Sequence, residues 1–344
     1  MKIILDVMGA DKPVEEFVEG ACLAVKEFGC EIILVGDEIQ ILSAFGEKGL
    51  EMDNIEIIDA LQTVTMEDNA MSVVREKSGS SMNLGLKALA EGKGDAFVSA
   101  GNTGALLAGA TFIVRRIRGL RAAIGTILPL AKPVLLVDSG ANINVTPENL
   151  EQFAKMGAIY MERLHGIKQP TVGLLNNGTE ETKGTDLHRE AYKRLTDTEL
   201  NFIGNIEGRD IPFAKADVIV TDGFTGNVVL KLCEGFGKFM TEQLKALFKS
   251  NLFGMASAAV MQKAIKAFKK KFDASEYGGA PLLGISKPVI KAHGSSDAKA
   301  VKNAIKQAIY YVNTGIIIEI ARQSSQLNVK KTEEKPEETT EEAK

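Results

Sequence analysis

Two segments of this chain run from a short apolar stretch, through a turn that contains glycine, into a helical pattern. In the first, residues 95–100 are followed by the turn 101–104; in the second, residues 216–221 are followed by the turn 222–227. Strand and helix patterns alternate in the same way through most of the 344 residues. Such alternation is typical of proteins in which helices cover a parallel sheet. The sequence therefore predicts an α/β fold with a largely parallel sheet.

Further strands are expected at 2–9, 31–36, 54–59, 133–138, 171–175 and 202–208, and several of them end in turns rich in glycine, asparagine or other polar residues. In an open α/β sheet, ligands bind outside the carboxyl ends of the strands. We therefore expect these turns to converge on one site. The mixed, polar segment 62–79 is expected to form a loop or a lid over a site.

The two glycine-containing turns are candidates for binding phosphate. A strand that leads through glycines into a helix leaves backbone N–H groups without intrahelical partners at the positive end of the helix dipole. The alternative is an ordinary connection in which glycine only permits a tight turn. Neither turn matches a Walker A loop or the dinucleotide-binding fingerprint, which argues against a nicotinamide cofactor. The candidates are Gly101, Asn102 and Thr103 in the first turn, and Asp222, Gly223, Thr225, Gly226 and Asn227 in the second.

Other candidates lie in three separate segments. Lys183 follows a predicted strand in a loop bounded by glycines, where a lysine could reach bound phosphate; a solvated surface lysine is the alternative. His293 lies in a turn of small residues, which suits either a polar site or a capping role. Asp6 and Gly9 belong to the first strand and its turn, although Asp6 could equally be a structural hydrogen-bond acceptor.

Composition excludes several classes of function. The three cysteines and three histidines are scattered, so we expect neither disulfides nor a metal site. The net charge is −4, and the segment 330–344, with six glutamates and four lysines, contributes −2 of it. The rest of the chain therefore has a net charge of only −2, which gives no reason to expect nucleic-acid binding. No apolar stretch has the length of a membrane-spanning helix, and the first residues do not resemble a signal peptide. These patterns favour a cytoplasmic protein with one α/β domain over residues 1–328 and a disordered acidic tail over 329–344.

A helical excursion interrupts the alternation at about 246–275. One helix is expected from 258 to 272, with lysines at helical spacing and apolar residues on another face. A basic amphipathic helix commonly lies on an anionic membrane surface or docks an acidic partner, whereas a dimer interface or an ordinary surface helix is the alternative. The candidates for contact are Leu252, Phe253, Met255, Val260, Met261, Lys263, Lys266 and Lys270. A second basic stretch, with Arg115, Arg116, Arg118 and Arg121, could meet an acidic protein or be a solvated face.

Five motifs taken together resemble the bacterial acyl-ACP:phosphate acyltransferase family (PlsX). They occur in the family's order and the resemblance spans about residues 1–327, with departures at Ala10 and Lys12, where glycine and histidine are expected. The motifs are Asp6-Val7-Met8-Gly9-Ala10-Asp11, Ser99-Ala100-Gly101-Asn102-Thr103-Gly104-Ala105, Thr221-Asp222-Gly223-Phe224-Thr225-Gly226-Asn227, Glu276-Tyr277-Gly278-Gly279-Ala280-Pro281-Leu282-Leu283-Gly284 and His293-Gly294-Ser295-Ser296.

The resemblance implies a Rossmann-like three-layer αβα fold, similar to phosphotransacetylases and to isocitrate and isopropylmalate dehydrogenases. It implies a homodimer without a cofactor that transfers a fatty acyl group from acyl carrier protein (ACP) to inorganic phosphate, giving acyl phosphate for phospholipid synthesis. It also implies attachment to the inner face of the membrane through the apolar helical excursion.

On this reading, phosphate attacks the thioester directly, because no Cys- or Ser-centred triad is visible in the sequence. We expect the two turns and Lys183 to hold phosphate and the developing charge, with Asn227 as a donor and His293 assisting the thiolate leaving group. The alternatives are a phosphotransacetylase-like enzyme that uses acyl-CoA, a nicotinamide-dependent dehydrogenase of similar fold, and a non-catalytic phosphate sensor or scaffold of lipid synthesis.

Overall fold

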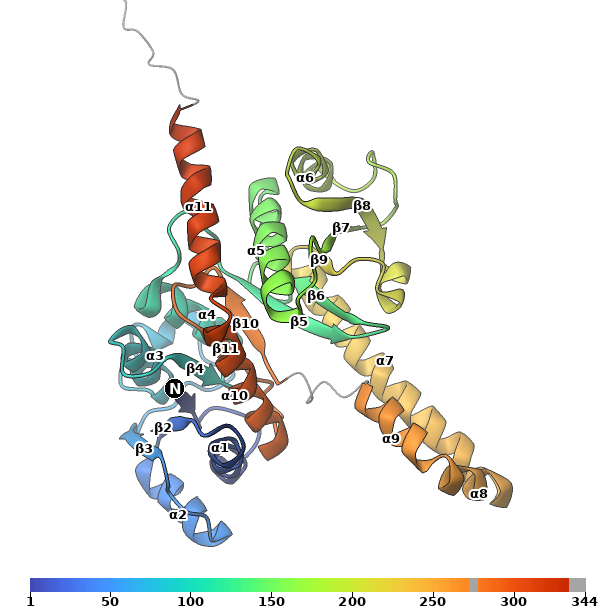
Figure 1. Cartoon of the computed structure of the whole chain (residues 1–344). Coiled ribbons are helices and arrows are strands. Elements are labelled where there is room, and N and C mark those ends of the chain that lie inside the picture. Colours follow the sequence, from blue (N-terminus) through green and yellow to red (C-terminus); the bar gives the residue numbers. More distant parts are fainter. Residues whose placement is uncertain (272–277, 334–344) are drawn as a thin grey trace, which may run out of the picture.

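The computed structural model describes residues 1–271 and 278–333, which form one sheet of eleven strands with helices on both faces (Figure 1). Across the sheet the strands follow the order β3-β2-β1-β4-β11-β10-β5-β6-β9-β7-β8. The strands are β1 (Lys2–Asp6), β2 (Glu31–Gly36), β3 (Ile55–Asp59), β4 (Ala96–Ser99), β5 (Ala123–Pro129), β6 (Pro133–Val137), β7 (Thr171–Asn176), β8 (Asn201–Glu207), β9 (Val218–Val220), β10 (Ala280–Leu283) and β11 (Val289–Lys291).

The helices are α1 (Val14–Phe28), α2 (Glu38–Lys48), α3 (Ser81–Ala90), α4 (Thr103–Gly109), α5 (Pro147–His165), α6 (Asp186–Thr196), α7 (Gly223–Lys249), α8 (Leu252–Val260), α9 (Gln262–Lys271), α10 (Ala298–Asn313) and α11 (Ile316–Glu333). Short 3₁₀ helices η1 (Ala70–Val73) and η3 (Gly208–Phe213) and the π-helical segment η2 (Ala110–Arg115) complete the described elements.

Most strand pairs are parallel, as predicted, but the middle of the sheet is antiparallel. Strand β10 pairs antiparallel with both β11 and β5, and β5 pairs antiparallel with β6. The pairing of β10 with β5 joins a half made of β1–β4 and β11 to a half made of β6–β9. Strands β5, β10 and β11 were not expected from the sequence.

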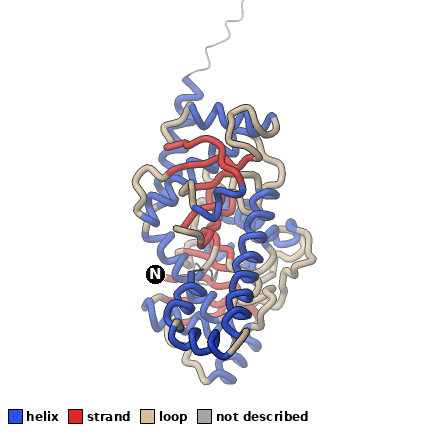
Figure 2. The backbone as a smooth tube through the Cα atoms, turned by 90° about the vertical axis from the view of Figure 1, so that its right-hand side faces the viewer, coloured by secondary structure: helices blue, strands red, loops and turns tan. Residues whose placement is uncertain are grey.

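The sheet is the middle layer of three, which confirms the predicted architecture (Figure 2). Along β1, Ile3 and Leu5 pack into the core on one face, while Ile4 packs into the core on the other, as side chains alternate along a strand. The first face is covered by α1, α2, α5, α6, α10 and α11, and the second by α3, α4, η3 and α7. The cavity described below is lined mainly by elements of the second face, together with the start of α10.

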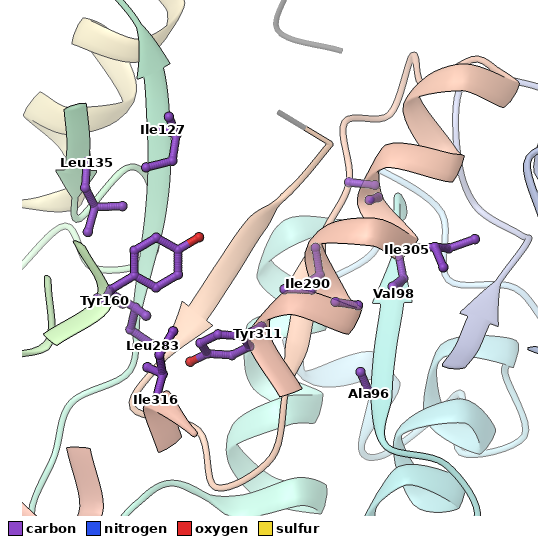
Figure 3. Close-up of a cluster of buried hydrophobic side chains, with 14 of the residues drawn as sticks. Ala96, Val98, Ile127, Leu135, Tyr160, Leu283, Ile290, Ile305, Tyr311 and Ile316 are labelled. Atoms are coloured by element: carbon purple, nitrogen blue, oxygen red, sulfur yellow. The ribbon is translucent and has the colours of Figure 1, made fainter. Parts of the chain in front are cut away.

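Two buried tyrosines pack where the halves of the sheet meet (Figure 3). Tyr160 of α5 and Tyr311 of α10 have ring centroids 6.1 Å apart, and the side chain of Gln307 donates to the Tyr160 hydroxyl. Burial raises the pKa of both hydroxyls well above the usual range. Because α5 belongs to one half and α10 to the other, these contacts hold the halves in one body.

The helical excursion consists of the outer part of α7 followed by α8 and α9, and it projects from the body (Figure 1). The prediction of one helix over 258–272 is wrong, because α8 ends at Val260 and α9 begins at Gln262. The composition changes at this point from the apolar, alanine-rich α8 to the lysine-rich α9. Phe272 and the rest of the excursion to 275 lie outside the described residues.

At the carboxyl end, α11 continues to Glu333, beyond residue 329, where the tail was expected to begin. Residues 334–344 lie outside the described residues. Among the helices that the structure describes, none combines the length and the hydropathy needed to span a bilayer.

Candidate active site

A cavity of about 1450 Å³ lies between the start of α4, strand β5, helix α7 and the loop that follows β11. One end is polar and includes Asp11, Thr103, Asn227, Lys291 and His293. The other end is apolar, with side chains from β5 and the turn after it, from η3 and from α7. These are Leu128, Leu130, Ile211, Val229, Phe236 and Met240. Ligand cavities of about 300–1000 Å³ hold drug-sized molecules, so this one is large enough for a long apolar chain beside a small polar group.

The polar end brings together three segments that are far apart in the sequence. Thr103 and Gly104 are the first residues of α4, Asn227 lies in the first turns of α7, and His293 follows β11. Thr103, Asn227 and His293 therefore all line this one cavity, and their role in a shared site stays a prediction. Within the described part of the chain, the N–H groups of Thr103 and Gly104 have no recorded protein acceptor.

Asn227 offers a hydrogen-bond donor to the cavity. Its amide nitrogen lies 3.0 Å from the position that a Cβ on Gly140 would occupy, so the amide packs directly on the Gly140 backbone. The side chain is half-buried, and no hydrogen bond to it is recorded among the described residues. A polar side chain without a protein partner at the wall of a cavity is suited to bind a ligand, because burying it unpaired costs free energy.

His293 is held in one tautomer by its own turn. The backbone N–H of Ser295 donates to His293 Nδ1 at 3.2 Å, so Nδ1 must be an acceptor. In the neutral imidazole the proton then lies on Nε2. His293 therefore presents an Nε2–H donor, which suits the predicted role of assisting the thiolate leaving group by a hydrogen bond to its sulfur.

The turn 222–227 does not offer the free N–H groups that the sequence suggested. The side chain of Asp222 caps α7 by accepting from the N–H groups of Phe224 and Thr225, both at 2.9 Å. The N–H of Gly223 donates to the Asn142 carbonyl, and that of Gly226 to the Asp222 carbonyl. An anion at this turn would contact side chains such as that of Asn227 instead of the helix terminus.

The glycines of this turn permit a close approach of two backbones. A Cβ on Gly226 would lie 1.8 Å from the Asp138 carbonyl oxygen, and one on Gly223 would lie 2.7 Å from the Asn142 nitrogen. Because both distances are shorter than any real contact of a Cβ atom, α7 can start here only with glycine at these positions.

In the turn 101–104, Asn102 has a structural position. Its Oδ1 accepts from the N–H of Ala105 as the N-cap of α4. Its Nδ2 donates to the carbonyls of Thr65, Met66 and Asp68, each at 3.1 Å. Asn102 thus ties the loop that precedes η1 to the start of α4, and the segment 62–79 packs beside the site as expected.

Asp6 and Gly9 do not line the cavity, but they contact the segments that lead to its polar end. The Ser99 hydroxyl donates to Asp6 Oδ2 at 2.7 Å, and the N–H of Gly101 donates to Ser99 Oγ. Burial raises the pKa of Asp6 to about 6. Gly9 has φ = 71°, and a Cβ there would lie 2.5 Å from the Val64 carbonyl oxygen, so this turn requires glycine.

Lys183 is not brought into the cavity. It lies exposed in the loop between β7 and α6, where its N–H donates to the Glu180 carbonyl. The loop leads to His188, whose pKa is lowered by burial and partly restored by the charge of Asp222, so the start of α6 lies near the start of α7. Contact between Lys183 and a ligand in the cavity would require this loop to move.

Lys291 is a site residue that the sequence did not reveal. It lines the polar end at the end of β11, and its Nζ donates to the carbonyls of Ala100 and Ala292. Partial burial lowers the pKa of this amine to about 8, against the opposing charges of Asp11 and Asp6. The signal in the sequence was a lysine directly after a short apolar run and two residues before His293.

Asp138 is the second residue that was missed, and it organises the loop opposite Asn227. Its Oδ1 accepts from the N–H groups of Ile124, Gly140 and Ala141, at 3.0–3.1 Å. Its Oδ2 accepts from the N–H and the side-chain amide of Asn142, at 2.7 and 2.8 Å. Because Ser139 and Gly140 line the cavity, this fully buried carboxylate fixes part of the cavity wall.

Among the described residues, no three His, Cys, Asp or Glu side chains lie close enough together to hold a metal ion. The donors that face the polar end are amides, an amine, an imidazole and backbone N–H groups, which are suited to bind an anion.

Comparisons with solved structures agree with the fold. The phosphotransacetylase of Streptococcus pyogenes superposes with a TM-score of 0.62 at 18% identity, and covers 91% of this chain and 94% of its own. The EutD phosphotransacetylase of Staphylococcus aureus gives 0.59 at 17% identity, with the same coverage. At such identities the likeness shows the fold alone.

The sequence comparisons are more specific. Residues 1–319 match the family described as "Fatty acid synthesis protein". A phosphate acyltransferase of Alkaliphilus oremlandii is 46% identical over 329 residues, which cover 95% of this chain and 98% of that protein. Another, from Acetivibrio thermocellus, is 42% identical over 337 residues, which cover 97% and 99%. The chain therefore belongs to the phosphate acyltransferase family of fatty acid synthesis proteins.

Proposed function

We propose that this enzyme transfers a long-chain acyl group from ACP to inorganic phosphate and thereby supplies acyl phosphate for phospholipid synthesis. The chain is an acyltransferase by its family. The observation that supports the proposal most is the division of one cavity into a polar end with unpaired donors and an apolar end. The polar end suits phosphate and the thioester, and the apolar end suits the acyl chain.

In the proposed reaction, a phosphate oxygen attacks the thioester carbonyl carbon, and the carbon–sulfur bond then breaks. The phosphate dianion is already a nucleophile near neutral pH, so the enzyme needs mainly to position it and to stabilise the tetrahedral oxyanion. The N–H groups of Thr103 and Gly104 and the ammonium of Lys291 would hold phosphate. The Asn227 amide would donate to the oxyanion, and His293 Nε2–H would assist the departing thiolate by donating a hydrogen bond to its sulfur, which then takes its proton from water. Lys183 would contribute to phosphate binding only with its loop moved towards the cavity.

The direct test uses the purified protein with phosphate and either palmitoyl-ACP or palmitoyl-CoA. Acyl phosphate is trapped with hydroxylamine and the released thiol is counted. We expect phosphate-dependent turnover that favours the ACP donor. A preference for CoA would assign the chain to phosphotransacetylase-like chemistry, the alternative that the shared fold keeps open. Absence of product from both donors would contradict the proposed function.

We further propose that the excursion rests on the anionic membrane surface where the product is used. The side chains of Phe253, Met255, Val260 and Met261 are exposed, as are those of Lys263 and Lys266 on α9. Exposed apolar residues next to lysines are typical of an interfacial helix. The side chains of Leu252 and Lys270 lie outside the described residues, and the homodimer implied by the resemblance stays a prediction.

Changing Phe253 and Val260 to Asp should release the protein from anionic liposomes. These two side chains are 87% and 88% exposed, so the double variant should fold normally while it loses apolar contact with the bilayer. Flotation measures the bound fraction, and acyl transfer in the absence of liposomes should stay near the parent value. Ile39→Asp, at an apolar residue 80% exposed on α2, is the matched control. Unchanged flotation of the double variant would exclude the membrane contact.

A further inference from the structure

Four arginines lie within the seven residues 115–121, between the end of η2 and the start of β5. Arg115, Arg116, Arg118 and Arg121 are all exposed, whereas Ile117 and Leu120 between them are buried. The apolar residues anchor the segment on the body, and the arginines face solvent. This segment, called the arginine loop below, is therefore a cationic surface held in a defined conformation.

Three of these arginines have no carboxylate partner in the described part of the chain. Within residues 1–271 and 278–333, no ion pair or side-chain hydrogen bond is recorded for Arg115, Arg116 or Arg118. Of the six arginines elsewhere in the described structure, five form ion pairs, such as Arg194 with Glu151 and Arg322 with Glu319, and only Arg75 has none recorded. Since the chain has 45 acidic residues against 41 basic ones, unpaired cations concentrated in one loop are not a consequence of composition.

The backbone at Arg115 is strained in a way that fixes this surface. Its φ of 79° lies in the left-handed region, which a residue with a side chain adopts at a cost. The N–H of Ser286 donates to the Arg115 carbonyl, and the Ser286 hydroxyl donates to the Val114 carbonyl. These two hydrogen bonds from a distant segment hold the backbone in this conformation. Glycine would fit this φ without strain.

We propose that the arginine loop docks the acidic face of the carrier protein that brings the acyl group to the cavity, an inference that rests on the proposed function. The guanidinium group pairs with carboxylates through two parallel hydrogen bonds, so several arginines in one loop suit an acidic protein helix. Complementary charge also speeds the encounter of the two proteins.

The shape of the surface favours a protein over a small anion. The hollow beside the loop has a volume of about 590 Å³ and is lined by Arg116, Arg118 and Arg121, but Glu148 lies in the same wall. Glu148 offsets part of the cationic charge inside the hollow, so the positive charge is greatest along the exposed face of the loop. The arginines instead extend along the loop, as contacts with a larger partner require.

The arginine loop is also in contact with the cavity wall. Arg121 Nε donates to Asn142 Oδ1 at 2.5 Å, and the Asn142 side chain donates to Asp138 Oδ2 at 2.8 Å. Asp138 in turn holds Gly140, which lines the cavity beside Asn227. The loop also contacts α5 and α11, where Gln152 donates to the Gly119 carbonyl and Ser324 to the Arg118 carbonyl, so its link to the cavity wall runs through Arg121 and Asn142.

The first test is the double variant Arg116→Glu/Arg118→Glu. We expect kcat/KM for palmitoyl-ACP to fall about tenfold or more, because two attractive contacts become repulsive. With palmitoyl-pantetheine, an uncharged donor of the same acyl group, kcat/KM should stay within about twofold of the parent. Raised salt should lower kcat/KM for palmitoyl-ACP in the parent and have little effect in the variant.

Two further variants serve as controls for position. Lys168→Glu reverses another exposed cation for which no ion pair is recorded among the described residues, and it should leave kcat/KM for palmitoyl-ACP unchanged. Lys263→Glu/Lys266→Glu reverses the charge of the excursion, the other basic surface. If that pair, and not the arginine pair, raised KM for palmitoyl-ACP, the docking proposal would be overturned.

Arg115→Gly separates docking from folding. Glycine relieves the strained φ, so the melting temperature should stay unchanged or rise by about 2 °C while kcat/KM for palmitoyl-ACP falls. A loss of activity without a loss of stability cannot come from misfolding. Unchanged kcat/KM in both Arg115→Gly and the arginine pair would overturn the proposal.

Binding of fluorescently labelled carrier protein, followed by polarisation, does not depend on turnover. Weaker binding to the arginine variants supports the docking surface even if acyl transfer to phosphate were absent, in which case only the proposed reaction would fail. Turnover in the parent with equal binding to parent and variants would overturn the docking surface alone. Loss of liposome flotation with unchanged carrier binding would assign the arginine loop to lipid and would also overturn it.

Discussion

Asn227→Ala should lower kcat about a hundredfold while the protein stays folded. Removing one preorganised donor to a developing oxyanion typically costs this much. The amide is half-buried at the cavity wall, and within the described structure it has no recorded hydrogen bond whose loss would destabilise the fold. The measurement is steady-state turnover with palmitoyl-ACP and phosphate, together with a thermal melt.

Two variants sharpen this result. Asn227→Asp keeps the size of the side chain but replaces the donor by a negative charge, so it should be at least as inactive as the alanine variant and should raise KM for phosphate. Asn313→Ala removes an exposed asparagine at the end of α10 and should leave kcat unchanged. Turnover of Asn227→Ala within about threefold of the parent would show that the amide does not contact the transition state.

The parts of the fold that could be predicted were those in which local signals agree. The end of α1 at Gly29, with φ = 61°, and the start of α5 at Thr146 and Pro147 follow the usual capping preferences. Strands β1, β2 and β7 are continuous apolar runs, as expected for parallel strands covered on both faces.

The strands that were missed lack such signals. Strand β10 spans only Ala280–Leu283 and contains Pro281, and β11 spans only Val289–Lys291. They form because β10 pairs with β5 and β11 pairs with β4, partners more than 150 residues away. Pairing over such a separation in sequence leaves no local pattern. The antiparallel centre of the sheet therefore could not be predicted from the sequence.

The candidate site was predictable in its location and less so in its chemistry. Thr103, Asn227 and His293, which the motifs singled out, all follow the ends of strands and line the same cavity, although β9 is not a neighbour of β4 or β11 in the sheet. The proposal of free N–H groups at the start of α7 was wrong, because the Asp222 side chain and the Asn142 carbonyl occupy them. Asn142 is 80 residues before Asp222. The sequence around Asp222 therefore could not indicate that the Asn142 carbonyl would accept a hydrogen bond from this turn.

Asp138→Asn should destabilise the protein by about 3 kcal/mol and also slow turnover. The carboxylate accepts five hydrogen bonds. An amide has one acceptor oxygen, so its NH₂ group would face backbone N–H donors on one side. Each buried donor left without a partner costs about 1–3 kcal/mol. The free energy of unfolding, measured by chemical denaturation, gives the size of the effect.

The loss of activity should exceed what stability explains. In Asp138→Asn the loop 139–142 loses the contacts that set Gly140 against Asn227, so kcat should fall at temperatures where the variant is still fully folded. Asp37→Asn makes the same chemical change at the N-cap of α2, where one oxygen accepts from the N–H of Gln40. Asparagine caps helices about as well as aspartate, so this control should change stability by less than about 0.5 kcal/mol and leave kcat unaltered. If Asp138→Asn kept the parent kcat when folded, the carboxylate would hold the fold without positioning the site.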